Sequence, residues 1–190
     1  MIYQKTTDMV QIKKCTFEHM TKSYPCKEKS VLDGCMIMRQ SIKPEDVQSP
    51  FQIEAYALLF CISGEVNIIS DLRSYTVTPG TLFVYLPNNI IKIDCKKESI
   101  ISEVILASDY LRKNFLQWNK ISPLFIQTTN NPVITIPTNR RDELIRMLGN
   151  IQERIRTATC SEWNRKAYHA ALKTFLYDII SLANNPEFLE

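Results

Sequence analysis

The stretch SYTVTPGTLFVYLP, residues 74–87, reads as a strand, a sharp turn and a second strand. Bulky apolar or aromatic residues alternate with threonine over 75–78, which is the pattern of a half-buried strand. A Pro-Gly pair at 79–80 interrupts the run, and the apolar segment 82–86 then ends at a proline. The chain contains only four glycines, so the glycine at this turn indicates a corner whose backbone angles other residues resist.

Similar short segments lie on both sides of this stretch. They are rich in apolar and β-branched residues, and turn-forming residues separate most of them. The expected strands cover residues 35–42, 54–62, 65–69, 75–78, 82–86, 90–94 and 100–107. Short strands separated by turns at intervals of about 8–12 residues are typical of an antiparallel sandwich or barrel.

The periodicity becomes helical after Ala107. Ser108 is a suitable N-cap for a short helix that carries Leu111, Phe115 and Trp118 on one face. Two long helices are then expected, each with an apolar stripe at spacings of four and three, as two packed helices have. The stripes consist of Leu144, Leu148, Ile151 and Ile155 in the first helix and of Tyr168, Leu172, Phe175, Ile179 and Leu182 in the second.

The expected ends of the long helices come from capping residues. Asn139, with Asp142 three residues later, fits the start of the first helix. Thr159 and Glu162 have the spacing of a capping box before the second helix. Gly149 lies within the first helix, where glycine costs about 1 kcal/mol relative to alanine.

Composition places the chain among ordinary globular proteins. Its 190 residues are 45% hydrophobic and 23% charged, which suits one domain with a sizeable core. The net charge of +3 is too small to indicate nucleic-acid binding by itself. No run approaches the ~20 apolar residues of a membrane helix, and the N-terminal residues lack the apolar core of a signal peptide. We therefore expect a cytoplasmic protein without membrane contact.

The six cysteines lie at positions 15, 26, 35, 61, 95 and 160 and include no Cys-x-x-Cys pair. This spacing argues against a zinc site. Several of them fall within apolar segments, where a free thiol acts as a small hydrophobe. A reducing compartment is therefore favoured over a disulfide framework.

Three segments together carry a family resemblance. LLFCISGEVNI (58–68) is followed by YTVTPGTLFVYLPNNIIKI (75–93), and ILASDYLRKNF (105–115) is followed by the two long helices. Over roughly residues 50–183 this order resembles the cupin-like N-terminal domain of AraC-type bacterial transcription regulators. The resemblance implies a mainly β fold with C-terminal helices. In this fold a cupin-like antiparallel β-barrel (a double-stranded β-helix, or jelly roll) precedes an α-helical pair.

The barrel interpretation gives two glycines a role. Gly64 and Gly80 would occupy corners at which the barrel closes. Ordinary hairpin turns in a β-sandwich are the alternative interpretation of both glycines.

We expect residues 1–190 to form a single regulatory domain. Its parts are an N-terminal arm, the barrel, a helix with connecting extended segments, and the helical pair, over residues 1–30, 31–107, 108–137 and 138–184. In the family, a C-terminal helix-turn-helix domain binds DNA. Nothing in this sequence matches that domain, so we expect a fragment of a longer regulator rather than a stand-alone sensor, with DNA binding only through a domain outside the chain.

The resemblance also sets expectations for metal binding. Cupin enzymes hold a metal with histidines and a glutamate inside the barrel, and the late histidine of that set falls near Ile91. The only histidines here, His19 and His169, lie in the expected arm and on the second long helix. We therefore expect no metal, no cofactor, no catalytic residues and no enzymatic activity.

The resemblance implies that a small-molecule effector binds in or at the mouth of the barrel. The candidate ligand-binding residues are Ile91 and two polar-tipped aromatic residues on barrel strands, Tyr56 and Tyr85. Strand parity could turn either tyrosine outward, and core packing is the alternative role for both. Two other functions stay open. They are a small cupin-type enzyme, which the missing histidines disfavour, and a stand-alone interaction module whose barrel is filled by bulky apolar side chains.

The resemblance further implies a homodimer that pairs through the helices. Leu176, Ile180 and Ala183 widen the apolar arc of the second helix, which is therefore expected to pack on two surfaces. The residues expected at a dimer interface are Leu172, Leu176, Ile179 and Ile180.

Overall fold

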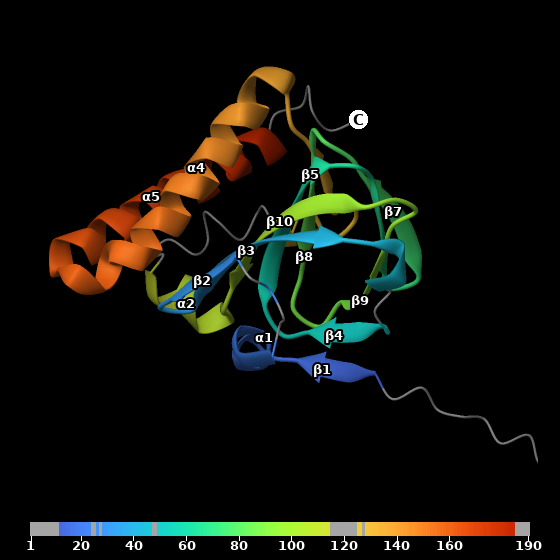
Figure 1. Cartoon of the computed structure of the whole chain (residues 1–190), viewed down its shortest axis with the longest axis horizontal. Coiled ribbons are helices and arrows are strands. Elements are labelled where there is room, and N and C mark those ends of the chain that lie inside the picture. The colour runs from blue at the N-terminus through green and yellow to red at the C-terminus, as the bar shows by residue number, and fades with distance from the viewer. Residues whose placement is uncertain are drawn as a thin grey trace, which may run out of the picture.

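The computed structural model describes residues 12–23, 26, 28–46, 49–114, 125–126 and 128–184. Figure 1 shows a barrel of strands with a pair of long helices along one side. The N-terminal elements β1 (Lys13–Cys15) and α1 (Phe17–Ser23) lie together at one end of the barrel, below it in this view. The expected fold class, a cupin-like antiparallel barrel followed by a helical pair, is confirmed.

Two sheets form the barrel. The five-stranded sheet has the order β1-β4-β9-β6-β7, and the six-stranded sheet has the order β11-β8-β5-β10-β3-β2. All strand pairs are antiparallel except β1 with β4. The further strands are β2 (Glu28–Leu32), β3 (Cys35–Ile42), β4 (Phe51–Ile53), β5 (Tyr56–Ser63), β6 (Val66–Ser70), β7 (Arg73–Val77), β8 (Thr81–Tyr85), β9 (Ile90–Asp94), β10 (Ser99–Leu106) and β11 (Val133–Thr135).

The two predicted glycine corners lie where the chain leaves one sheet for the other. Gly64 connects β5 of the six-stranded sheet to β6 of the five-stranded sheet, and Gly80 connects β7 back to β8. Their φ angles are +86° and +105°, and residues that carry a Cβ rarely adopt these backbone angles. A Cβ at Gly64 would also collide with the side chain of Ser99 and lie 2.9 Å from its Cα. Both corners therefore need glycine.

The six-stranded sheet separates two hydrophobic cores. Side chains on its inner face meet those of the other sheet inside the barrel. Side chains on its outer face pack against the helices. Strand β10 contributes to both cores, since Ile101 and Ile105 point inward while Val104 and Leu106 point outward.

The helical pair consists of α4 (Thr138–Thr157) and α5 (Glu162–Ala183), with the short 3₁₀ helix η2 (Ala158–Cys160) between them. The predicted apolar stripes of both helices are buried. The capping-box prediction was wrong: the N-cap of α5 is Ser161, whose hydroxyl accepts a hydrogen bond from Asn164 N at 3.1 Å. Residues 158–160 form η2 instead, so Thr159 lies inside a different helix.

The expected boundaries of the barrel were too narrow. Residues 1–30, the expected arm, contain β1 and most of β2. Residues 108–137, expected to connect the barrel to the helices, contain β11, which pairs with a barrel strand. Within that segment, α2 (Ser108–Asn114) begins at the predicted cap. Phe115 and Trp118 lie outside the described residues. Among the described residues, no helix has both the length and the apolar composition needed to span a membrane.

Candidate functional site

A cavity of about 350 Å³ lies within the barrel. Residues of β3, β4, β8, β9 and β10 line it, together with the N-terminal elements and the segment before β4. The lining side chains are Lys13, Cys15, His19, Met20, Met38, Ser49, Pro50, Phe51, Ile53, Tyr85, Ile91, Ile93, Glu103 and Ile105. The barrel is therefore not filled by its own side chains, and most of the lining is apolar.

Glu103 is a buried acid in this lining. Glu103 lies in the middle of β10 and is only 4% exposed to solvent. Directly opposite it on the neighbouring strands are Met38 of β3 and Leu59 of β5. The Oε2 atom of Glu103 has no hydrogen-bond partner among the described residues. Burial raises the pKa of this carboxyl to about 8, so it is largely protonated at neutral pH.

Glu103 was not among the site residues predicted from the sequence. The signal was present, because β10 has the sequence SIISEVIL, in which Glu103 is the one charged residue of an apolar strand. A charge in such a strand is rare unless it is paired or functional. The parity of β10 then places it on the inner face.

Tyr85 and Ile91, two of the three predicted ligand-binding residues, line the cavity. Tyr85 is buried, and its ring lies 4.9 Å from that of Phe83, centroid to centroid. Ile91 is fully buried at the wall formed by β9. Ligand binding by either residue stays a prediction, but both are in a position to contact an occupant of the barrel.

Tyr56, the third predicted residue, lies on the opposite face of its sheet. Its side chain packs against the core shared with the helices, and its ring centroid lies 4.4 Å from that of Phe125. Strand parity explains the difference, because residues of β5 alternate between the barrel interior and the outer face. Tyr56 therefore cannot contact a ligand inside the barrel.

His19 reaches the cavity although the sequence placed it in an arm away from the barrel strands. Strand β1 pairs in parallel with β4, with Lys13 opposite Phe51, and this pairing places α1 at the cavity. The backbone N–H of Glu54 also donates to the carbonyl of Cys15 at 3.0 Å. Such a parallel pairing between distant segments leaves no local pattern in the sequence.

The cavity does not suit the metal that cupin enzymes hold. Ile91, near the position of the late metal histidine, presents an aliphatic side chain. Of the potential ligands, Cys15, His19 and Glu103 line the cavity. Within the described part of the chain, no group of three or more His, Cys, Asp and Glu side chains is arranged to hold a metal ion.

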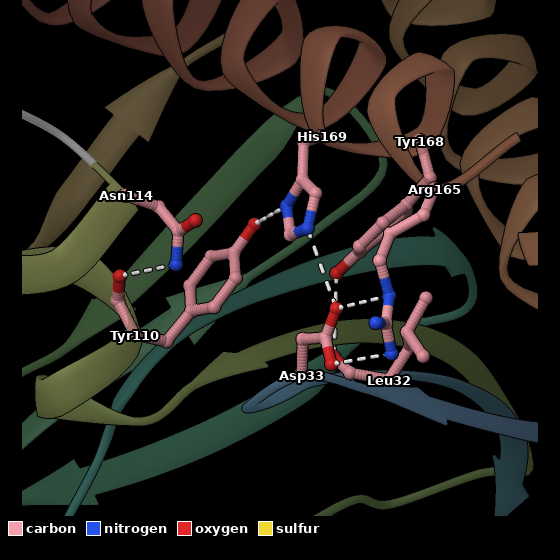
Figure 2. A network of polar contacts seen from close by, with 7 residues as sticks. All are labelled: Leu32, Asp33, Tyr110, Asn114, Arg165, Tyr168 and His169. Atoms are coloured by element: carbon pink, nitrogen blue, oxygen red, sulfur yellow. Dashed lines mark hydrogen bonds and ion pairs between the residues drawn. The ribbon is translucent and has the colours of Figure 1, made fainter. Parts of the chain in front are cut away.

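A second polar cluster joins the barrel to α5, as Figure 2 shows. Asp33, in the turn between β2 and β3, lies at its centre. Arg165 contacts both carboxylate oxygens of Asp33, at 3.1 and 3.2 Å, and His169 Nε2 lies 3.3 Å from Oδ2. His169 Nδ1 lies 2.9 Å from the hydroxyl of Tyr110 on α2. These groups bind one another, so the cluster acts as a joint between three elements.

The nucleophilic side chains near this joint are deactivated by burial. Burial raises the pKa of the Cys35 thiol to about 12, and it also raises the pKa of the hydroxyls of Tyr110 and Tyr168. Burial lowers the pKa of His169, and this effect outweighs the opposing influence of Asp33. The thiol and the two phenols are therefore protonated at neutral pH, so none of them is present as a thiolate or a phenolate.

Three of the four residues expected at a dimer interface have no surface to offer a second chain. Leu172, Leu176 and Ile179 are fully buried between α4, α5 and the outer face of the six-stranded sheet. Ile180 is partly buried against the same core. The sequence showed that α5 packs on two surfaces but not that the barrel of the same chain covers the second. Homodimerisation stays a prediction, and it requires residues other than these three.

No protein-family model matches the sequence, and no curated protein matches it. Solved structures that resemble it include the EutQ protein of Clostridium difficile, with a TM-score of 0.34 and 17% identity, over 40% of this chain and 58% of that one. A cupin superfamily protein from Desulfitobacterium hafniense has a TM-score of 0.39 and 18% identity, over 42% of this chain and 72% of that one.

A cupin-2 domain protein from Shewanella frigidimarina has a TM-score of 0.36 and 12% identity, over 40% of this chain and 72% of that one. At these TM-scores the likenesses support no conclusion about function. The fold assignment rests on the strand order and pairing of the chain itself.

Proposed function

We propose that the chain is the ligand-sensing and dimerisation domain of an AraC-type transcription regulator and is not an enzyme. The observation that carries the proposal is the barrel cavity of about 350 Å³, with the buried carboxyl of Glu103 in its wall. Ligand sites are typically concave and mostly apolar, with a few polar groups that orient the ligand. The volume is at the lower end of the usual range of about 300–1,000 Å³, so the effector is small.

The six-stranded sheet supports a sensing role because one of its faces lines the cavity and the opposite face packs against the helices. Glu103 lies on its inner face, and the neighbouring residue Val104 belongs to the core formed with the helices. A ligand that shifts β10 therefore acts on both cores. The joint of Asp33, Arg165 and His169 is a second connection between the barrel and α5.

The basic residues of α4 favour a structural role over DNA contact. Arg140 lies 2.9 Å from Asp178, Arg141 donates to the carbonyl of Ile62 at 2.9 Å, and other arginines of the helix alternate with acidic residues. Sequence-specific binding needs side chains directed at base edges. We therefore assign DNA binding to a helix-turn-helix domain outside this chain, and we assign the chain a cytoplasmic location and a homodimeric state as parts of the same proposal.

The test is a thermal-shift screen with a small-molecule library, followed by two variants. Ile91→Phe adds bulk to the cavity wall, whereas Tyr56→Phe removes a hydroxyl on the opposite face of the sheet. Compounds that raise the Tm of the unmodified protein should fail to do so in Ile91→Phe and should still do so in Tyr56→Phe. Binding that survives in Ile91→Phe, or is lost only in Tyr56→Phe, would show that the barrel is not the ligand site.

A further inference from the structure

The cavity contains one acid that pairs with no basic side chain of the described chain. Among the described residues, Glu103 is the one acidic side chain of the lining, and its Oε2 has no hydrogen-bond donor. The ion pairs found in the described residues join other acids, so no basic side chain there contacts Glu103. Met38 and Leu59 lie directly opposite it on the neighbouring strands.

A buried carboxyl without a donor is destabilising, and glutamine or leucine would fit the same strand at less cost. Because Glu103 faces the cavity, an occupant of the cavity can supply the missing donor. We propose that the cavity binds a small organic monocation, a primary or secondary ammonium group on an apolar body, and that the ammonium donates to the carboxylate of Glu103. This inference rests on the proposed ligand-binding function of the barrel and names the class of ligand.

The surroundings of Glu103 favour this class over the alternatives. A ligand with a carboxylate or phosphate group would place its negative charge beside the Glu103 carboxyl in an apolar wall, which is unfavourable. A metal ion would not find three ligands among the described residues. An ammonium forms a charge-assisted hydrogen bond there, which is stronger than a bond to a neutral donor. The apolar wall, including Met20, Met38 and Ile93, accommodates an alkyl or aryl body.

The other titratable groups of the cavity limit the ligand to one positive charge. In the described part of the chain they are Lys13, Cys15 and His19 on the N-terminal elements and Tyr85 on β8. Lys13 is exposed and His19 is half-buried, so both lie toward the solvent side of the cavity. A second ammonium group directed outward would meet the positive charge of Lys13, which disfavours polyamines.

Ionisation of Glu103 provides a specific signature of this binding mode. Burial raises the pKa of its carboxyl to about 8, so the free protein is mostly protonated there at pH 7. An ammonium ligand binds the ionised form and therefore releases close to one proton at that pH. Its affinity should rise about tenfold between pH 6 and pH 7 and level off above pH 8.

The experiment uses n-hexylammonium, 1-hexanol and hexanoate as cationic, neutral and anionic probes of similar shape. Binding is followed by NMR of ¹³C-labelled methionine methyl groups. Met20 and Met38 report on the cavity, and Met147 on α4 is the remote control. At pH 7.5, hexylammonium should bind at least tenfold more tightly than hexanol, hexanoate should bind more weakly than either, and the Met147 signal should stay in place.

Two variants identify the group responsible. Glu103→Gln should weaken hexylammonium binding at least tenfold and abolish its pH dependence, and it should weaken hexanol binding much less. His19→Gln, which removes another titratable group of the cavity, should keep the preference for the cation and its pH dependence. Calorimetry of the unmodified protein in buffers of different ionisation enthalpy measures the released proton and does not depend on either variant.

The outcomes separate this inference from the proposed function. If hexanol or hexanoate binds at Met38 as tightly as hexylammonium, or if no proton is released, the ammonium class is wrong while ligand binding in the barrel stands. If no probe shifts the Met20 or Met38 signals at millimolar concentration, both the inference and the proposed ligand site are contradicted.

Discussion

The Nε2 atom of His169 lies 3.3 Å from the carboxylate of Asp33. An ionised carboxylate can only accept a hydrogen bond, so the proton must belong to the ring. Because burial lowers the pKa of His169, the ring is neutral at neutral pH and its Nδ1 carries no proton. The hydroxyl of Tyr110, 2.9 Å from Nδ1, is then the donor. Asp33 thus fixes the tautomer of a side chain that connects α5 to α2.

We expect ¹⁵N NMR to find His169 as the Nε2–H tautomer at pH 7.5. Asp33→Asn preserves the turn, because asparagine also tolerates the φ of +49° at this position. It should weaken the tautomer preference and cost about 1 kcal/mol, since the Arg165 side chain is half exposed and its ion pair is screened by solvent. A majority of the Nδ1–H tautomer in the unmodified protein would contradict the hydrogen-bond directions described here.

Glu103 should make the protein less stable as the pH rises. Its pKa of about 8 in the folded state exceeds the ordinary value of 4.5, so the folded state binds the extra proton between these values. Stability should therefore fall by about 1.4 kcal/mol per pH unit from this group as pH rises from about 5 to 8.

Urea denaturation of the unmodified protein and of Glu103→Gln at several pH values measures this contribution. The difference between the two proteins should grow with pH in favour of the variant and become constant above pH 8. A difference that does not change with pH would mean that Glu103 is ionised or paired in the folded state.

Gly149 offers a stabilising substitution. It lies on an exposed position of α4, and a Cβ added there would meet no atom within 4 Å. Gly149→Ala should therefore stabilise the protein by about 1 kcal/mol and raise its Tm by about 2–4 °C. Gly64→Ala is the contrasting control, because its Cβ would collide with Ser99 and its φ is +86°. It should destabilise the protein, and a neutral effect there would contradict the corner geometry.

Leu176 should tolerate no charge. It is fully buried between the helices and the barrel, so Leu176→Glu places an acid in an apolar core and should cost more than about 3 kcal/mol. Ala170→Glu, on an exposed position of the same helix, should change stability by no more than about 0.5 kcal/mol. Circular dichroism and sedimentation distinguish the outcomes. A folded Leu176→Glu protein that becomes monomeric would instead make this surface a dimer interface.

The predictable part of the fold came from local patterns. Alternation and turn residues predicted the strands, and the positive φ angles at Gly64 and Gly80 followed from the need for corners. The stripes of the two long helices were visible because their 3.6-residue period is a property of each helix alone. Ser161 was missed as a cap because Thr159 and Glu162 have the spacing of a capping box, whereas Ser161 is followed three residues later by Asn164. A sequence motif also cannot show where a 3₁₀ turn intervenes.

The site was harder to predict because it depends on contacts between distant segments. The parity that turns Tyr85 inward and Tyr56 outward is set by strand register, which the sequence left open. His19 reaches the cavity only because β1 pairs with β4. The placement of Leu176 depends on the barrel covering α5, and an apolar helical face does not reveal whether its partner is the same chain or another.

Alternation along β10 also affects how the protein can be altered by mutation. Neighbouring side chains on this strand point to different cores, so a change of Ile105 or Glu103 alters the shape and charge of the cavity while the contacts of Val104 and Leu106 with the helices persist. Ligand preference can therefore diverge through inward-facing positions without the helical surface having to change with it. Insertion or deletion of one residue within β10 would have the opposite effect, because it would exchange the two sets of side chains and disrupt both cores at once.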